Sequence, residues 1–159
     1  MVRRIVAFLV AIATLVVLGT TAQSLFVQRA WVNAAVQSGV ATDGIALLDR
    51  LRWIGHDLIG LLPAYGGLTA IALLLGLLAA GGITRFTGQR RVIYALAGAA
   101  CMFTLFTILK AVLGTVGVFG ARGSGLMAQV LVGLAAALLF AQMTEPPPKA
   151  KPATPAAIS

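Results

Sequence analysis

The chain has 159 residues, of which 60% are hydrophobic and only 10% are charged. This apolar share exceeds the roughly one half found in soluble domains, and it falls into four blocks separated by charges, as in proteins with several membrane spans. The formal net charge of +8 does not indicate a nucleic-acid binder, because the basic residues are scattered at the ends of apolar runs and do not cluster on one polar face. The composition therefore predicts an all-α integral membrane bundle of four transmembrane helices, forming one domain over residues 1–143.

The first segment joins a basic start, Arg3 and Arg4, to the apolar run Ile5–Leu18. With small residues at positions 20–22, the segment also fits a secretory signal peptide, which would be cleaved. We favour an uncleaved first transmembrane helix over about residues 5–22, because the later apolar blocks pack well only as part of a bundle. The cleaved alternative stays open at this point.

Residues 24–57 form the one sizeable polar connection, on the outer side of the membrane. An apolar stripe opposed by polar residues predicts a first amphipathic helix that ends at Gly39. Asp43 has the side chain to cap a second one. Trp31 and Trp53 suit the headgroup level. We therefore expect one or two amphipathic helices at the membrane surface between the first and second spans.

Three further apolar runs predict spans over about residues 58–83, 92–114 and 126–143. Small residues recur every four positions in the second and fourth spans, a spacing that lets a neighbouring helix approach closely. These candidate helix-packing residues are Ala72, Gly76, Ala80, Gly133, Ala137 and Ala141. Residues 144–159 hold five of the six prolines and almost nothing to bury, so we expect a disordered, lysine-containing tail.

The distribution of Lys and Arg predicts the orientation. With both termini in the cytoplasm, seven basic residues fall on the cytoplasmic side and five on the outer side. Short loops rich in arginine face the cytoplasm, and the loop holding Arg85, Arg90 and Arg91 is the strongest part of this argument. We therefore expect both termini to be cytoplasmic.

Ionisable side chains lie near the outer ends of spans two to four. Charges at membrane depth are costly unless they pair or face water, so one hypothesis pairs Asp57 with Lys110 or Arg122. Together with Tyr65 these residues would form a shallow, outward-facing ligand pocket. The plainer alternative, which we favour, is that Lys110 extends to the headgroups and Asp57 only begins the second span.

The sequence shows no pattern that indicates catalysis, a metal site or a cofactor. It lacks a nucleophile elbow, a phosphate-binding loop and metal-ligand spacing. His56 and Asp57 are neighbours in sequence, and neighbours on a helix do not face each other. Cys101, the single cysteine, has no partner for a disulfide or a metal cluster. We therefore expect a protein that is not an enzyme.

A resemblance to a known family rests on three stretches of the sequence. They are the start of the second span and the later runs Tyr94-Ala95-Leu96-Ala97-Gly98-Ala99 and Ala121-Arg122. The residues at that start are His56, Asp57, Leu58, Gly60, Pro63 and Tyr65. Over about residues 20–143 the chain resembles a family of small, uncharacterised four-helix inner-membrane proteins of proteobacteria. The resemblance implies four helices in the bacterial inner (plasma) membrane and implies no activity.

These observations lead to two functional hypotheses. The leading one is a non-enzymatic accessory or assembly subunit, or a homo-oligomer, that acts through helix packing in the lipid bilayer against a membrane-protein partner or its own copy. The alternative is a binding or transport protein with the outward-facing polar pocket, which would take a small ligand or a lipid headgroup.

Overall fold

The computed structural model of the protein describes residues 2–39, 45–113 and 123–145. Within these ranges every regular element is helical, which confirms the all-α fold class. The elements are α1 (Val2–Gln37), α2 (Leu47–Leu61), the π-helical turn η1 (Leu62–Gly66), α3 (Gly67–Thr87), α4 (Arg90–Leu113) and α5 (Ser124–Met143). Four helical stretches are long and apolar enough to cross a membrane: α1, the continuous run from α2 to α3, α4 and α5.

Helix α1 is much longer than the predicted first span. Its 36 residues, at about 1.5 Å each, measure roughly 54 Å. No glycine or proline stands between residues 20 and 37, so nothing interrupts the backbone hydrogen bonds there. The separate surface helix predicted after residue 24 is therefore corrected to an extension of α1. Gly39 lies just past the helix end with a φ of +76°, as the sequence predicts.

The second predicted span also begins earlier than expected. Residues 47–87 form one continuous helical run in which α2, η1 and α3 follow each other without a break. Proline has no backbone N–H and its ring crowds the preceding turn, and at Pro63 the chain responds by widening into the π-helical turn η1. Asp43, the predicted cap, lies outside the described residues, and Ala46 at the helix start makes no side-chain cap.

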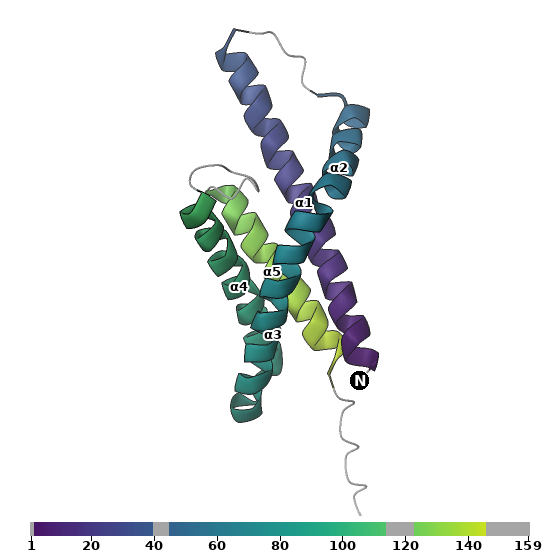
Figure 1. The fold of residues 1–159 in the computed structure, drawn as a ribbon, viewed down its shortest axis with the longest axis vertical. Helices are drawn as coiled ribbons and strands as arrows, with labels where there is room; N and C mark the ends of the chain where they lie inside the picture. Colours follow the sequence, from purple (N-terminus) through teal and green to yellow (C-terminus); the bar gives the residue numbers. More distant parts are fainter. Residues whose placement is uncertain (1, 40–44, 114–122, 146–159) are drawn as a thin grey trace, which may run out of the picture.

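The distal part of α1 and the whole of α2 project together beyond the other helices (Figure 1). We call residues 24–37 and 47–61 the stalk. The rings of Trp31 and Trp53 meet edge to face across it, with centroids 6.5 Å apart. The two halves of the stalk thus pack on each other, and each continues directly into an apolar helical stretch.

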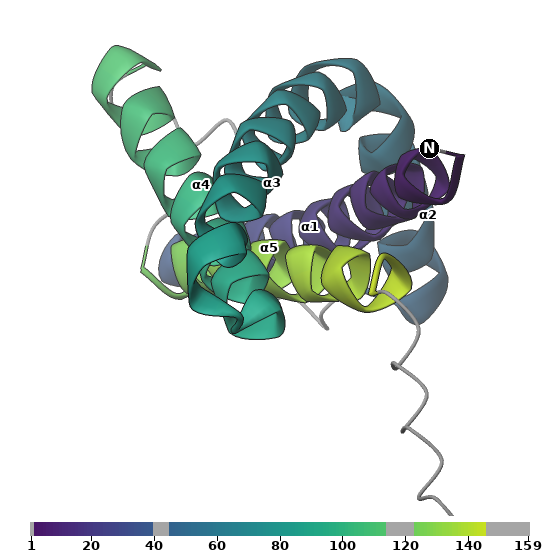
Figure 2. The same cartoon turned by 90° about the horizontal axis from the view of Figure 1, so that it is seen from below.

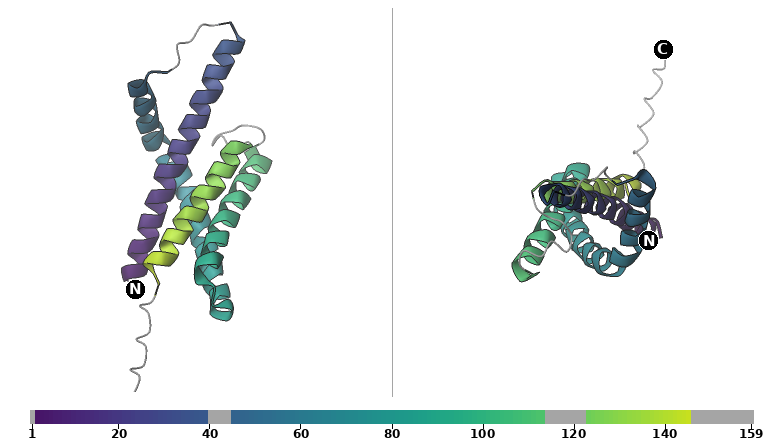
Figure 3. Two further views of the ribbon diagram at one scale, coloured as in Figure 1. Left: turned by 180° about the vertical axis from the view of Figure 1, so that it is seen from behind. Right: turned by 90° about the horizontal axis from the view of Figure 1, so that it is seen from above.

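Below the stalk, α5 packs between α1 and α4, and α3 packs on α4 (Figure 3). Seen from below, α1 and α5 run side by side (Figure 2). The closest crossing joins α4 and α5, where a Cβ added to Gly98 would collide with the carbonyl oxygen of Gly133. Glycine at both positions allows the two backbones to touch.

The starts of α1 and α4 meet the end of α5 at one end of the molecule. The Arg3 Nε donates to the carbonyl oxygen of Met143 at 2.7 Å. Arg91 and Glu145 form an ion pair of 2.6 Å, and the Arg90 Nη2 donates to the Thr144 hydroxyl at 2.5 Å. Both ends of the described chain therefore lie at the same end of the bundle.

Candidate functional site

A line of buried polar side chains runs along α1 toward the stalk, and we call it the polar seam. Its members on α1 are Thr20, Gln23, Ser24 and Gln28, each at most 5% exposed. They recur at spacings of three and four residues, which places them on one face of the helix. Polar groups buried this deeply need hydrogen-bond partners; Ser24 and Gln28 find theirs on α2, and the Gly19 carbonyl one turn earlier accepts from α5.

The innermost contact of the seam joins three segments. The Tyr65 hydroxyl in η1 donates to Gln129 Oε1 of α5 at 2.6 Å. The Gln129 Nε2 donates in turn to the backbone carbonyl of Gly19 in α1 at 3.0 Å. A Cβ at Gly19 would collide with the Tyr65 hydroxyl, so only glycine leaves room for this contact. The Thr69 hydroxyl donates to the Tyr65 carbonyl at 2.7 Å and caps the widened turn.

Farther toward the stalk, the seam joins α1 to α2. The Ser24 hydroxyl donates to Asp57 Oδ2 at 2.6 Å. The Gln28 Nε2 reaches the carbonyl oxygen of Arg50 at 3.4 Å. In the described part of the chain, Gln28 Oε1 and the Thr20 hydroxyl have no hydrogen-bond partner. These two hydrogen bonds thus join the α1 and α2 halves of the stalk to each other.

The structure describes three of the four predicted pocket residues, and these three do not form a common pocket. Asp57 is half-buried and bonded to Ser24, and Tyr65 points inward to Gln129. Lys110 is exposed near the end of α4. Arg122 lies outside the described residues. Asp57 forms no ion pair with any residue that the structure describes.

Sequence reasoning missed Ser24 and Gln129 as partners of the predicted site residues. The signal for Ser24 was the three- and four-residue spacing of polar residues from Thr20 to Gln28. That spacing is readable only if α1 is taken as one helix. Gln129 gave no signal beyond being a glutamine inside an apolar run, because its partners come from segments far away in the sequence.

Five of the six small residues predicted to pack helices lie at contacts within the chain, and the sixth, Ala72, is half-buried on α3. Gly133, Ala137 and Ala141 belong to the interior of the bundle. A Cβ at Gly76 would stand 3.1 Å from Cys101 Cβ and 3.3 Å from the Ala97 carbonyl oxygen. Ala80 is fully buried. These residues bring α3, α4 and α5 close to one another.

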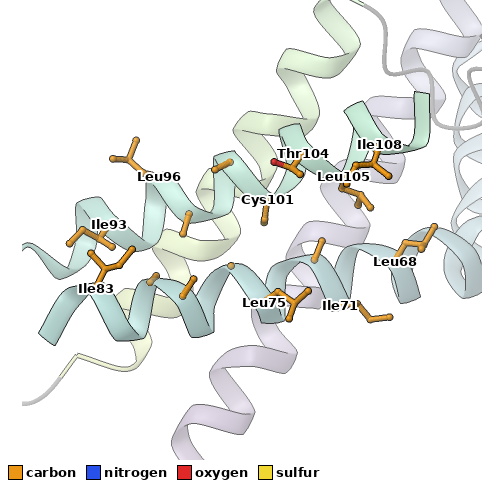
Figure 4. Close-up of a pocket in the computed structure, with 16 residues that line it drawn as sticks. Leu68, Ile71, Leu75, Ile83, Ile93, Leu96, Cys101, Thr104, Leu105 and Ile108 are labelled. Atoms are coloured by element: carbon orange, nitrogen blue, oxygen red, sulfur yellow. The ribbon is translucent and has the colours of Figure 1, made fainter. Parts of the chain in front are cut away.

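An apolar groove of about 690 Å³ runs along the outer side of the α3–α4 contact. Figure 4 shows its walls, large aliphatic side chains from both helices. Small residues form the floor between them: Ala72, Gly76, Ala79, Ala80, Ala97, Ala100 and Cys101. No charged side chain lines this α3/α4 groove, and Thr104 brings the one hydroxyl.

The described residues contain no group of three or more His, Cys, Asp or Glu side chains that could hold a metal ion. His56 is exposed on the stalk. Comparisons of the chain with protein-family models, curated proteins and solved structures find no match. The predicted resemblance to small inner-membrane proteins therefore stays a prediction, and the function is argued from the geometry alone.

Proposed function

We propose that the protein is a non-enzymatic integral membrane protein that works as an accessory or assembly subunit, by holding a further transmembrane helix in the α3/α4 groove. That helix belongs to a membrane-protein partner or to a second copy of the chain. The single observation that carries the proposal is the groove itself, with its floor of small residues between aliphatic walls.

The exposed surface supports membrane insertion. Soluble proteins rarely leave large contiguous apolar patches in water, yet Leu75, Leu78, Phe86 and Leu131 are 62%, 65%, 89% and 62% exposed. Lipid tails remove the cost of exposing such side chains. Helix α5, with 20 residues, measures about 30 Å, which matches the hydrocarbon core of a bilayer.

The proposed topology follows from the same lengths and from the arginines. The bilayer is that of the bacterial inner membrane, with the Arg3, Arg90 and Arg91 end in the cytoplasm. Because α1 is roughly 54 Å long and the hydrocarbon core is only about 30 Å thick, the stalk stands beyond the opposite face.

The groove suits a helix because helix association in lipid depends on close van der Waals packing. Without a hydrophobic driving force between helices, small residues contribute by letting backbones approach. Ala79 and Ala100 face the groove and are exposed, so they make few contacts inside the chain. They would meet the bound helix directly.

The hypothesis of an outward pocket around Asp57 and Tyr65 has less support. Both side chains make short hydrogen bonds inside the molecule, to Ser24 and Gln129. These bonds fit a structural role, in which Ser24–Asp57 joins the two halves of the stalk and Tyr65–Gln129 holds η1 against α5.

A photo-crosslinking residue placed at Ala100 tests the proposal in native membranes. We expect irradiation to give a discrete protein adduct from Ala100. The same residue at Ala135, which is exposed on α5 and outside the groove, should react with lipid only. Equal adducts from the two positions, or none from Ala100, would count against an occupied groove.

A further inference from the structure

A second cavity, of about 870 Å³, lies on another face of α3 and shares no lining residue with the α3/α4 groove. It is bounded by the start of α1, the last turns of α3, the start of α4 and Phe140 of α5. This is the end of the molecule at which α1 begins, toward the bottom of Figure 1. We call it the basic groove.

Three arginines line the basic groove without a carboxylate among its lining residues. They are Arg4, Arg85 and Arg90, from three different helical ends. Glu145 is the acidic residue described at this end of the molecule, and it is engaged by Arg91 at 2.6 Å. The other described acidic residues, Asp49 and Asp57, lie on α2. The basic groove therefore carries a formal charge of +3 that no lining residue offsets.

The Arg90 guanidinium is held in place by its neighbours, but one of its N–H donors has no acceptor in the described chain. Its guanidinium donates to Thr144 at 2.5 Å and lies 5.1 Å from the centroid of the Tyr94 ring. Its Nε is enclosed and finds no acceptor among the residues that the structure describes. A buried, charged donor without an acceptor is unfavourable, so the chain does not use the full hydrogen-bonding capacity of this guanidinium.

The remaining lining is apolar. Ile5 and Phe8 of α1 face Leu74, Leu77 and Leu78 of α3, and these side chains lead away from the arginines along the helices. A ligand that satisfies both parts must join an anionic head to a hydrocarbon tail. A free inorganic anion would use the arginines and leave the apolar walls uncovered.

We propose that the basic groove binds an anionic phospholipid. Its phosphate lies between Arg4, Arg85 and Arg90, and an acyl chain follows Phe8, Leu74 and Leu78. Charge-assisted hydrogen bonds from arginine to phosphate are strong and directional, and basic pockets between transmembrane helices recognise anionic headgroups in this way. The lipid would fill the space between the start of α1 and the end of α3.

Lipid binding by the full chain in detergent tests this proposal. Titrations with phosphatidylglycerol and with phosphatidylcholine of the same acyl chains would be followed by native mass spectrometry. We expect the wild type to bind phosphatidylglycerol at least about tenfold more tightly, a difference of roughly 1.4 kcal/mol. The double variant Arg4→Gln/Arg85→Gln should lose this preference. Both arginines are exposed, so the fold should persist.

The control variant Arg29→Gln/Arg52→Gln removes the same charge from exposed positions on the stalk, and it should keep the preference. Equal binding of the two lipids by the wild type, or equal loss in the two double variants, would overturn the proposal. A third titration adds inorganic phosphate as competitor. We expect it not to displace phosphatidylglycerol at millimolar concentration, whereas full displacement would assign the arginines to a free anion and overturn the lipid site.

Discussion

The hydroxyl of Tyr65 and the side-chain oxygen of Gln129 are 2.6 Å apart although the residues lie 64 positions apart in the chain. Their hydrogen bond joins the π-helical turn η1 to α5, and Gln129 extends it to the Gly19 carbonyl of α1. One buried glutamine thus fixes the relative axial positions of α1, η1 and α5. Apolar helices can pack on each other in several axial registers with similar van der Waals contacts. A buried polar contact of this kind selects one of those registers.

Tyr65→Phe should destabilise the protein by roughly 0.5–2 kcal/mol, because it leaves a buried amide oxygen without its donor. Unfolding in mixed micelles measures the loss. Gln129→Leu should cost more, since it removes both hydrogen bonds. A double-mutant cycle with the two substitutions should give a coupling energy clearly above zero. Additive losses would show that the two side chains do not interact.

Gly19→Ala should destabilise the protein by about 1–3 kcal/mol through overpacking, because the new methyl group collides with the Tyr65 hydroxyl. In the Tyr65→Phe background the loss should be smaller, since the hydroxyl is gone. Gly60→Ala is the matched control: no atom outside its own turns lies within 4 Å of the added Cβ, and alanine favours the helix. A Gly60→Ala loss as large as that of Gly19→Ala would contradict this explanation.

Ser24→Ala should loosen the stalk without unfolding the bundle. The Ser24 hydroxyl bonds to the Asp57 carboxylate at 2.6 Å, and hydrogen bonds to charged groups contribute about 1.5–3 kcal/mol. Amide hydrogen exchange in α2 should become faster, while α4 and α5 keep their protection. Ser38→Ala serves as control, because that hydroxyl bonds only to the Ala34 carbonyl of its own helix. If amide hydrogen exchange in α2 were the same in Ser24→Ala as in the wild type, the Ser24–Asp57 hydrogen bond would not stabilise the stalk.

Gly133→Ala should strongly disrupt the packing of α5 on α4. A Cβ at this position would collide with the Met102 side chain and approach the Gly98 carbonyl oxygen, and backbone cannot yield as a flexible side chain does. We expect a loss of at least about 2 kcal/mol in micelle unfolding. Gly82→Ala on α3 is the matched control, because nothing lies within 4 Å of the added Cβ there. A loss at Gly133 no larger than the loss at Gly82 would argue against the close α4–α5 crossing.

The apolar blocks predicted the four helical spans because block length and composition decide which segments can cross a bilayer. They did not predict where α1 and α2 begin and end. Residues 24–37 change from apolar to amphipathic while remaining good helix formers, so composition changes there and backbone conformation does not. Pro63 was equally ambiguous: a proline marks a helix start as readily as a π-helical turn inside a continuous helix.

The hydrogen-bond and packing partners of individual side chains could not be predicted from the sequence, for a different reason. One hypothesis paired Asp57 with a basic residue, whereas in the structure its carboxylate accepts a hydrogen bond from Ser24 of α1. Small residues at every fourth position predict close helix contacts, but the spacing does not say whether the contact lies within the chain or outside it. Gly133 turned out to face Gly98 and Met102 of the same chain. Such choices depend on which helix faces meet, and that is set by the packing of the whole bundle.

The α3/α4 groove is the central element of the proposed function, and filling it gives the most direct test. Ala79→Leu/Ala100→Leu adds bulk to two exposed positions that line the groove, whereas Ala135→Leu adds bulk to an exposed position on α5 outside it. Native mass spectrometry of each protein, extracted gently from its own membrane, measures the fraction in complex. We expect the groove variant to reduce that fraction about tenfold or more and the Ala135→Leu control to match the wild type. A complex that survives the groove variant intact, or a wild type that is monomeric throughout, would contradict the account.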